Sequence, residues 1–168
     1  YKFLREMEFN RLLSSVTSAY GEPELEETVK ETTPKQKQQS ISKKNYHLIT
    51  NEKEIDEWIN EAEEAGELAI DTETSSLDAH QADLVGISLS TKVGKACYIP
   101  IGHKFKGCLK KESVIKKLKP LLEDKSVKKI GQNIKFDFIV LFKQGINMNS
   151  MEDTMLMSYV LDAGKNRH

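Results

Sequence analysis

Three short runs of β-type sequence follow one another between residues 67 and 101, and this succession restricts the possible folds more than any other feature. The runs are ELAIDTE, LVGISLS and KACYIPI. In the middle run Val85, Ile87 and Leu89 alternate with small or polar residues, which is typical of a strand with one buried face. Strands at such short spacing favour antiparallel hairpins, so we predict a β-meander here.

Helix-type and strand-type patterns alternate on either side of this meander. YHLIT, residues 46–50, predicts a strand, and the helix after it should begin at Asn51 and end at Gly66. One apolar face of that helix would comprise Ile55, Trp58, Ile59 and Ala62. Beyond the meander the patterns predict a helix around residues 114–122, a strand at VKKIG, and helices at KFDFIVLFKQG and MEDTMLMSYVLDAG. Together they predict an α/β fold in which helices flank a mixed sheet.

The first 45 residues differ in composition from the rest. Residues 1–20 carry Phe3, Leu4, Met7, Leu12 and Leu13 at near-helical spacing, which predicts one amphipathic helix. Residues 21–45 contain few large apolar side chains, and we expect a polar, flexible linker. Residues 46–168 then form the folded domain, and 168 residues suit one domain with an appendage. The chain starts at Tyr1 and stops in a polar stretch, so we expect both ends to be cut from a longer protein.

Composition excludes several classes of protein. The formal net charge is −1, which points neither to a basic duplex-coating protein nor to an acidic tail. The two cysteines, Cys97 and Cys108, show no CxxC spacing, so neither a disulfide scaffold nor a zinc site is expected. No apolar run approaches the roughly 18 residues of a membrane span, and the first residues show no apolar h-region of a signal peptide. We therefore expect a cytoplasmic protein without membrane contact.

Two carboxylates stand where the first strand of the meander ends, in DTETSSLD. Asp71 and Glu73 are two residues apart, so both point to the same face of an extended strand, where they would repel each other. A divalent cation between them would remove the repulsion, because hard oxygen ligands suit Mg²⁺ and Mn²⁺. The alternative is a plain solvated strand end, since the chain contains 26 acidic residues.

A second polar motif, GQNIKFD, follows the predicted strand VKKIG and begins a helix. Asn133 and Asp137 are four residues apart, which places them on one helical face. Asp137 could bring a third carboxylate to Asp71 and Glu73. The alternative is an ordinary helix start with Asn133 as its N-cap.

Taken together, DTETSSLD, the strand pair after it, GQNIKFD and MEDTMLMSYVLDAG resemble the 3′–5′ proofreading exonuclease domain of bacterial DNA polymerase I, family A. The resemblance runs from about Tyr46 to the end of the chain, and FLREMEFNRLL is similar to the end of the 5′-nuclease domain that precedes it. It implies a ribonuclease-H-like, DnaQ-like fold that is incomplete at its C-terminus. Residues 1–20 would then be a remnant helix of the preceding domain.

The resemblance also implies a site and its partners. Asp71, Glu73 and Asp137 would bind two divalent cations, Mg²⁺ or Mn²⁺, with Asp71 bridging both, Glu73 on one, and Asp137 acting on the other through water. Five residues would line the path of the terminal nucleotide: Thr74, Leu77, Gln132, Asn133 and Phe136. The substrates would be single-stranded or frayed 3′ DNA ends, the partner would be the polymerase domain of the same parent chain, and the setting would be nucleoid-associated.

One motif that the resemblance implies is missing. The third exonuclease motif, Y-x-x-x-D, does not occur, and Tyr159–Asp162 reads YVLD, one residue too short. Without that acid the metal site would bind Mg²⁺ poorly, so we expect the 168-residue chain alone to be weakly active or inactive. Two alternatives stay open. One is a free-standing ribonuclease D-like exonuclease that acts on RNA, and the other is a non-catalytic domain that holds DNA or the polymerase.

The remaining polar and sulfur-containing residues have simpler interpretations. We expect Asp153 to be a helix N-cap rather than a fourth metal carboxylate, and Trp58 to be a core residue. The four histidines share no ligand spacing, and His103 is interpreted as a loop residue. We interpret Met148, Met151, Met155 and Met157 as core. The lysine-rich region from Lys104 to Lys119, with Lys125, Lys128 and Lys129, is interpreted as a solvated surface rather than a phosphate track.

Overall fold

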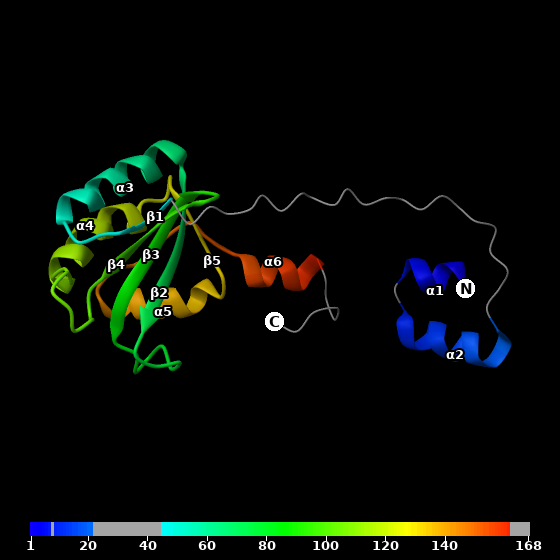
Figure 1. Ribbon diagram of the computed structural model, residues 1–168. Helices are drawn as coiled ribbons and strands as arrows, with labels where there is room; N and C mark the ends of the chain where they lie inside the picture. The colour runs from blue at the N-terminus through cyan, green and yellow to red at the C-terminus, as the bar shows by residue number, and fades with distance from the viewer. Residues whose placement is uncertain (8, 22–44, 162–168) are drawn as a thin grey trace. The chain divides into compact units, whose positions relative to one another are not determined.

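The computed structural model describes residues 1–7, 9–21 and 45–161 (Figure 1). They belong to two units, within residues 1–39 and 40–168, each considered by itself. The first contains α1 (Lys2–Glu6) and α2 (Asn10–Tyr20), so the prediction of one helix over residues 1–20 is wrong. The break between α1 and α2 lets the rings of Phe3 and Phe9 meet edge to face at 6.3 Å, which covers apolar surface that a straight helix would leave in water. The predicted linker lies outside the described residues, except for its two end residues.

The second unit is built on a six-stranded sheet with the order β1-β4-β3-β2-β5-β6. The strands are β1 (Tyr46–Leu48), β2 (Glu67–Thr74), β3 (Leu84–Lys92), β4 (Lys95–Pro100), β5 (Lys128–Gly131) and β6 (Met151–Asp153). Strands β2, β3 and β4 pair antiparallel, and the other pairs are parallel. The β-meander and the mixed sheet are therefore confirmed.

Strand β6 differs from the prediction, because its residues were assigned to the start of the last helix. The Lys129 N–H donates to the Ser150 carbonyl at 2.7 Å, and Met151 lies opposite Lys129 in the parallel ladder. The free backbone groups at the edge of β5 thus draw three residues into the sheet before the helix starts.

Four helices accompany the sheet: α3 (Glu52–Ala65), α4 (Lys111–Glu123), α5 (Ile134–Lys143) and α6 (Thr154–Leu161). As predicted, the Asn51 side chain caps α3 by accepting the Lys53 N–H at 3.1 Å. Gly66 ends α3 with φ 69°, a left-handed conformation that glycine adopts without a steric penalty. Ile55, Trp58 and Ala62 of α3 are buried.

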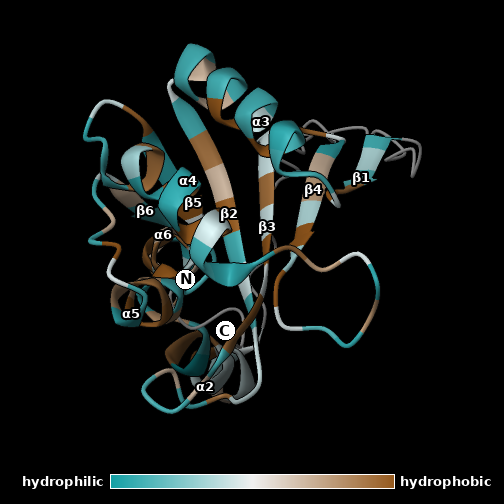
Figure 2. Ribbon diagram, turned by 90° about the vertical axis from the view of Figure 1, so that its left-hand side faces the viewer, coloured by the Kyte–Doolittle hydropathy of each residue, from teal (hydrophilic) through white to brown (hydrophobic). Residues whose placement is uncertain are grey.

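The sheet has one face packed into the core and one more open face. Along β2, Leu68, Ile70 and Thr72 are buried, whereas Asp71 and Glu73 between and beyond them are exposed. The core joins the buried side chains of β2, β3 and β4 to those of α3, α4 and α5. In Figure 2 the ribbon of α3 is coloured mostly as hydrophilic, whereas β2 and β3 carry hydrophobic residues. The alternation along β2 therefore sends Asp71 and Glu73 away from the core.

One lysine and two methionines lie where the sequence did not place them, and the interpretation as solvated surface is wrong for Lys129. Lys129 is fully buried, burial lowers the pKa of its ammonium group, and its Nζ donates to the Val127 carbonyl at 2.6 Å. Met148 lies in the core, but Met151 and Met157 are exposed, so the core interpretation is wrong for these two. Among the described residues, no helix has both the length and the apolar character needed to cross a membrane.

Candidate active site

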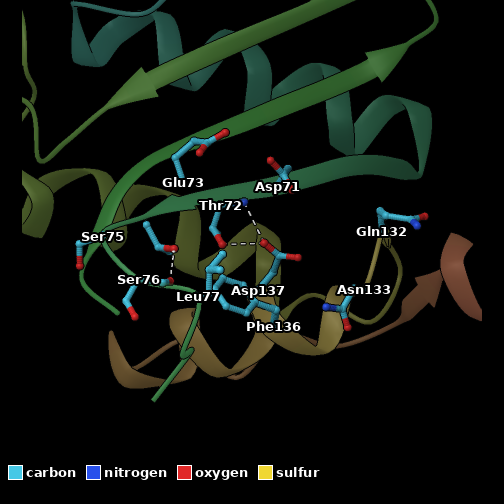
Figure 3. Close-up of a pocket in the computed structure, with 11 residues that line it drawn as sticks. Asp71, Thr72, Glu73, Ser75, Ser76, Leu77, Gln132, Asn133, Phe136 and Asp137 are labelled. Carbon is cyan, nitrogen blue, oxygen red and sulfur yellow. Dashed lines mark hydrogen bonds between the residues drawn. The ribbon is translucent and has the colours of Figure 1, made fainter. Parts of the chain in front are cut away.

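A pocket of about 500 Å³ lies where β2 ends and α5 begins (Figure 3). All eight site residues predicted from the sequence line it, together with three more from β2 and the loop after it. The lining residues are Asp71, Thr72, Glu73, Thr74, Ser75, Ser76, Leu77, Gln132, Asn133, Phe136 and Asp137. The fold thus brings both sequence motifs to one place, while the chemical roles of these residues stay predictions.

The three predicted catalytic carboxylates reach this pocket from two sides of β2. Asp71 and Glu73 project from the open face of the strand, as its alternating burial requires. Asp137 lies on the other side, beside Thr72, and Figure 3 shows this separation. Strand β2 therefore stands between the D-x-E pair and the acid of α5.

Asp137 is held more tightly than either partner. It is 2% exposed, and its Oδ1 accepts hydrogen bonds from the Thr72 N–H at 2.8 Å and the Thr72 hydroxyl at 2.6 Å. Burial raises the pKa of Asp137 above its usual value; the Thr72 hydrogen bonds oppose this rise, and the charge of Asp71 adds to it. Positive charge in the pocket would therefore stabilise the ionised form of Asp137.

The three carboxylates suit a hard divalent cation, because such a cation prefers oxygen ligands. Across residues 1–7, 9–21 and 45–161, however, no three acidic, histidine or cysteine side chains lie close enough together to form a ready-made metal site. A cation bound here would thus take one or two carboxylates directly and keep water on its other positions, as Mg²⁺ commonly does in proteins.

The loop that presents Gln132 and Asn133 is fixed from the neighbouring strand. Asn133 has φ 56°, an unusual left-handed backbone, and its side chain makes no capping hydrogen bond to α5. Instead, Asp153 Oδ1 accepts the Asn133 N–H and the Met155 N–H, both at 2.9 Å. Asp153 thus caps α6, as predicted, and also holds the pocket loop. The adjacent Thr154 hydroxyl donates to Gln132 Oε1 at 2.5 Å.

The rim of the pocket carries an unusually exposed apolar residue. Leu77 is 98% exposed, although a leucine side chain gains free energy when it leaves water. Phe136, across the pocket on α5, is partly buried and packs against the core. The loop between β2 and β3, which carries Leu77, is closed at its base by two hydrogen bonds between Ser75 and Asp83, at 3.0 and 2.9 Å.

Sequence reasoning missed the residues that position this site. Thr72 stands between the two carboxylates in the motif, and its side chain points to the opposite face of β2. Because side chains alternate along a strand, Thr72 must point into the core, and a buried hydroxyl needs a hydrogen-bond partner. This signal could have identified Thr72 from the sequence. Asp153 was recognised as a cap, but its second hydrogen bond depends on β6, which the sequence did not predict.

Comparisons with known proteins agree with this geometry. A family model described as 3′-5′ exonuclease matches residues 46–168. DNA polymerase I of Pseudomonas aeruginosa is 42% identical over 130 residues, which cover 74% of this chain and 14% of that protein. DNA polymerase I of Rhizobium leguminosarum is 44% identical over 135 residues, which cover 68% of this chain and 13% of that protein. The chain thus spans only a small part of the length of these relatives.

Solved structures show the same fold. NrnC of Brucella melitensis, determined with bound Mg²⁺, is 27% identical with a TM-score of 0.54, covering 74% of this chain and 56% of that chain. RNase D of Trypanosoma brucei shares the fold, at 16% identity and a TM-score of 0.55, covering 66% of this chain and 38% of that chain. These likenesses confirm the predicted ribonuclease-H-like fold. With the family match over residues 46–168 and polymerase relatives above 40% identity, the chain belongs to the 3′–5′ exonuclease family and is related there to bacterial DNA polymerase I.

Proposed function

We propose that this chain is the 3′–5′ exonuclease domain of a bacterial DNA polymerase and removes mismatched 3′ nucleotides as nucleoside 5′-monophosphates. The observation that supports this best is one pocket that combines Asp71, Glu73 and Asp137 with the apolar side chains of Leu77 and Phe136. The substrates would be single-stranded or frayed 3′ DNA ends. The partner would be a polymerase domain of the same parent chain, working in the cytoplasm at the nucleoid.

The proposal includes two divalent cations, Mg²⁺ or Mn²⁺. Asp71 would bind both, Glu73 would bind one, and Asp137 would reach the other through water. When bound, such ions activate a water molecule and stabilise the oxygen that leaves the phosphorus. The Mg²⁺-bound structure of the related NrnC supports a role for divalent metal here.

The chain's own residues would orient the substrate. Thr72 holds Asp137 by one oxygen, and Figure 3 shows the second oxygen turned away from Thr72. Leu77 and Phe136 would take the terminal base between them, since unpaired bases are bound by stacking and apolar contact. That contact would also give the exposed Leu77 side chain its missing apolar partner. Three polar residues, Thr74, Gln132 and Asn133, would hydrogen-bond the sugar and phosphate.

Hydrolysis under single-turnover conditions tests this function. A 5′-labelled single-stranded oligodeoxynucleotide, mixed with excess protein and Mn²⁺, should shorten from its 3′ end and release nucleoside 5′-monophosphates. We expect the 168-residue chain to react slowly, and Asp71→Ala to reduce the rate by about 100-fold or more, because the bridging carboxylate is lost. Hydrolysis that survives Asp71→Ala would contradict the proposal. Faster cleavage of the matching RNA would favour a ribonuclease D-like enzyme.

A second candidate function is a non-catalytic domain that holds DNA or the polymerase. It is favoured by the absence, within the described residues, of three metal-ligating side chains close together. Oligonucleotide binding without any shortening in Mg²⁺ or Mn²⁺ would support this candidate.

A further inference from the structure

A group of aromatic and basic side chains lies on and beside the open face of the sheet, outside the pocket. In the ladder between β2 and β3, Asp71 lies opposite Ser88, and between β3 and β4, Ser88 lies opposite Tyr98. Directly opposed residues point to the same face, so Tyr98 shares the open face with Asp71. With adjacent strands about 4.8 Å apart, the two residues are separated by roughly 10 Å.

The Tyr98 side chain leans along β4 toward the level of Glu73. Gly86 lies opposite Glu73, and a Cβ placed on Gly86 would lie only 1.9 Å from the Tyr98 hydroxyl oxygen. A glycine is therefore required for the phenol to occupy this place. Burial raises the pKa of Tyr98, and the charge of Glu73 raises it further, consistent with a phenol near that carboxylate.

The connection between β4 and α4 contains residues 103–106, HKFK, here called the 103–106 loop, and Tyr98 anchors its first residue, His103. The Tyr98 hydroxyl and His103 Nε2 are hydrogen-bonded at 2.6 Å. Ring centroids are 5.7 Å apart for Tyr98 and His103, and 6.0 Å apart for His103 and Phe105. The three rings form a continuous row that begins on the open face and passes into the 103–106 loop.

Phe105, the last ring of this row, is exposed and packs against the backbone of its own loop. Phe105 is 47% exposed, and its ring lies back over Gly107, where an added Cβ would come within 2.6 Å of it. Lys104 and Lys106, on either side of Phe105, are exposed, and within the described part of the chain neither forms an ion pair. Lys117 and Lys119, by contrast, are bound internally to Asp56 and to the Gly145 carbonyl.

We propose that the 103–106 loop binds the single-stranded DNA that continues beyond the terminal nucleotide, with Phe105 stacked on a base and Lys104 and Lys106 on phosphates. This inference rests on the proposed function and extends its site across the sheet. Aromatic rings alternating with unpaired cations match single-stranded nucleic acid, which offers stacked bases alternating with phosphates. The hydrogen bond between Tyr98 and His103 fixes the loop before substrate arrives, which lowers the entropy lost on binding.

Fluorescence anisotropy of labelled oligothymidylates tests this surface, with Ca²⁺ in place of Mg²⁺ to prevent cleavage. For an oligomer of about 12 nucleotides, we expect Phe105→Ala in the full chain to weaken binding about tenfold, and Phe105→Trp to retain it, because stacking needs a flat ring. Lys104→Gln with Lys106→Gln should reduce the slope of log K against log salt concentration by about 1.4, since each lost phosphate contact contributes about 0.7.

The matched control changes two other exposed lysines, on α3 and α4, which form no ion pair within residues 1–7, 9–21 and 45–161. Lys53→Gln with Lys116→Gln alters the net charge equally and should leave the salt slope within about 0.3 of the wild-type slope. A Phe105→Ala chain that binds the oligomer of about 12 nucleotides within twofold of wild type would overturn the inference and leave the proposed function standing. A wild-type chain that binds no oligomer would overturn both.

Discussion

Asp137 and Thr72 show how the site depends on a residue that sequence reasoning did not select. The Thr72 hydroxyl donates to a carboxylate that is almost fully buried, and a buried acceptor that loses its donor is costly. The motif DTET predicts the acids because their spacing is visible in the sequence. Their partner across the fold depends on where α5 packs, which the sequence motif does not specify.

Thr72→Val should therefore destabilise the chain by about 1–3 kcal/mol, because valine has the same shape but no hydroxyl. Asp137 has a raised pKa in the folded state, so its contribution to stability is present at acid pH and is lost as the pH rises from the ordinary carboxyl value through the raised one. Losing the Thr72 donor raises the pKa further. Urea unfolding in EDTA should show a larger loss at about pH 7 than at about pH 4.

Thr91→Val is the matched control for this measurement. The Thr91 hydroxyl also donates to a carboxylate, Glu61 Oε1, at 2.9 Å, but in a partly exposed place. Its removal should cost less than about 1 kcal/mol at neutral pH. Equal losses in the two variants, or a Thr72→Val loss that does not change with pH, would contradict this account of Asp137.

At the scale of elements, the junction of β6 and α6 supports the loop that carries Gln132 and Asn133. Asp153 accepts two backbone N–H groups with one oxygen, one from the start of α6 and one from Asn133. Its side chain thus combines a helix cap with support for a left-handed residue.

Asp153→Ala should cost about 1–2 kcal/mol, more than an ordinary cap, because Asn133 also loses its acceptor. Asp153→Asn keeps an acceptor oxygen and should retain most of that stability. Asn51→Ala, which removes the simple cap of α3, provides the control, at about 1 kcal/mol. Chemical denaturation measures all three, and a loss for Asp153→Ala no larger than that for Asn51→Ala would show that the bond to Asn133 contributes nothing.

The elements that sequence patterns predicted share strong local signals. The meander alternates clearly, and α3 has both a cap at Asn51 and a left-handed glycine at its end. Strand β6 was missed because three residues carry little periodicity and pair only since β5 offers a free edge. The break in residues 1–20 was missed because a contact between Phe3 and Phe9, and not a glycine or proline, accompanies it.

At the scale of the molecule, we propose that the exonuclease domain is residues 46–168 and that residues 1–20 belong to a preceding domain. Neither α1 nor α2 contains a buried residue, and isolated helices of this length are marginal in water. A chain that starts at Asn45 should therefore unfold within about 2 °C of the full chain in a thermal scan. A decrease of about 5 °C or more would mean that the first unit stabilises the second.

The central claim, that Asp71, Glu73 and Asp137 form a divalent-cation site, is tested most directly by paramagnetic broadening with Mn²⁺. Substoichiometric Mn²⁺ should broaden the backbone amide signals of residues 71–77 and 132–137, which line the pocket. Asp71→Ala should abolish this pattern. Broadening that persists in Asp71→Ala, or that centres instead on the groove lined by Glu54, Glu57 and Glu61, would contradict the claim.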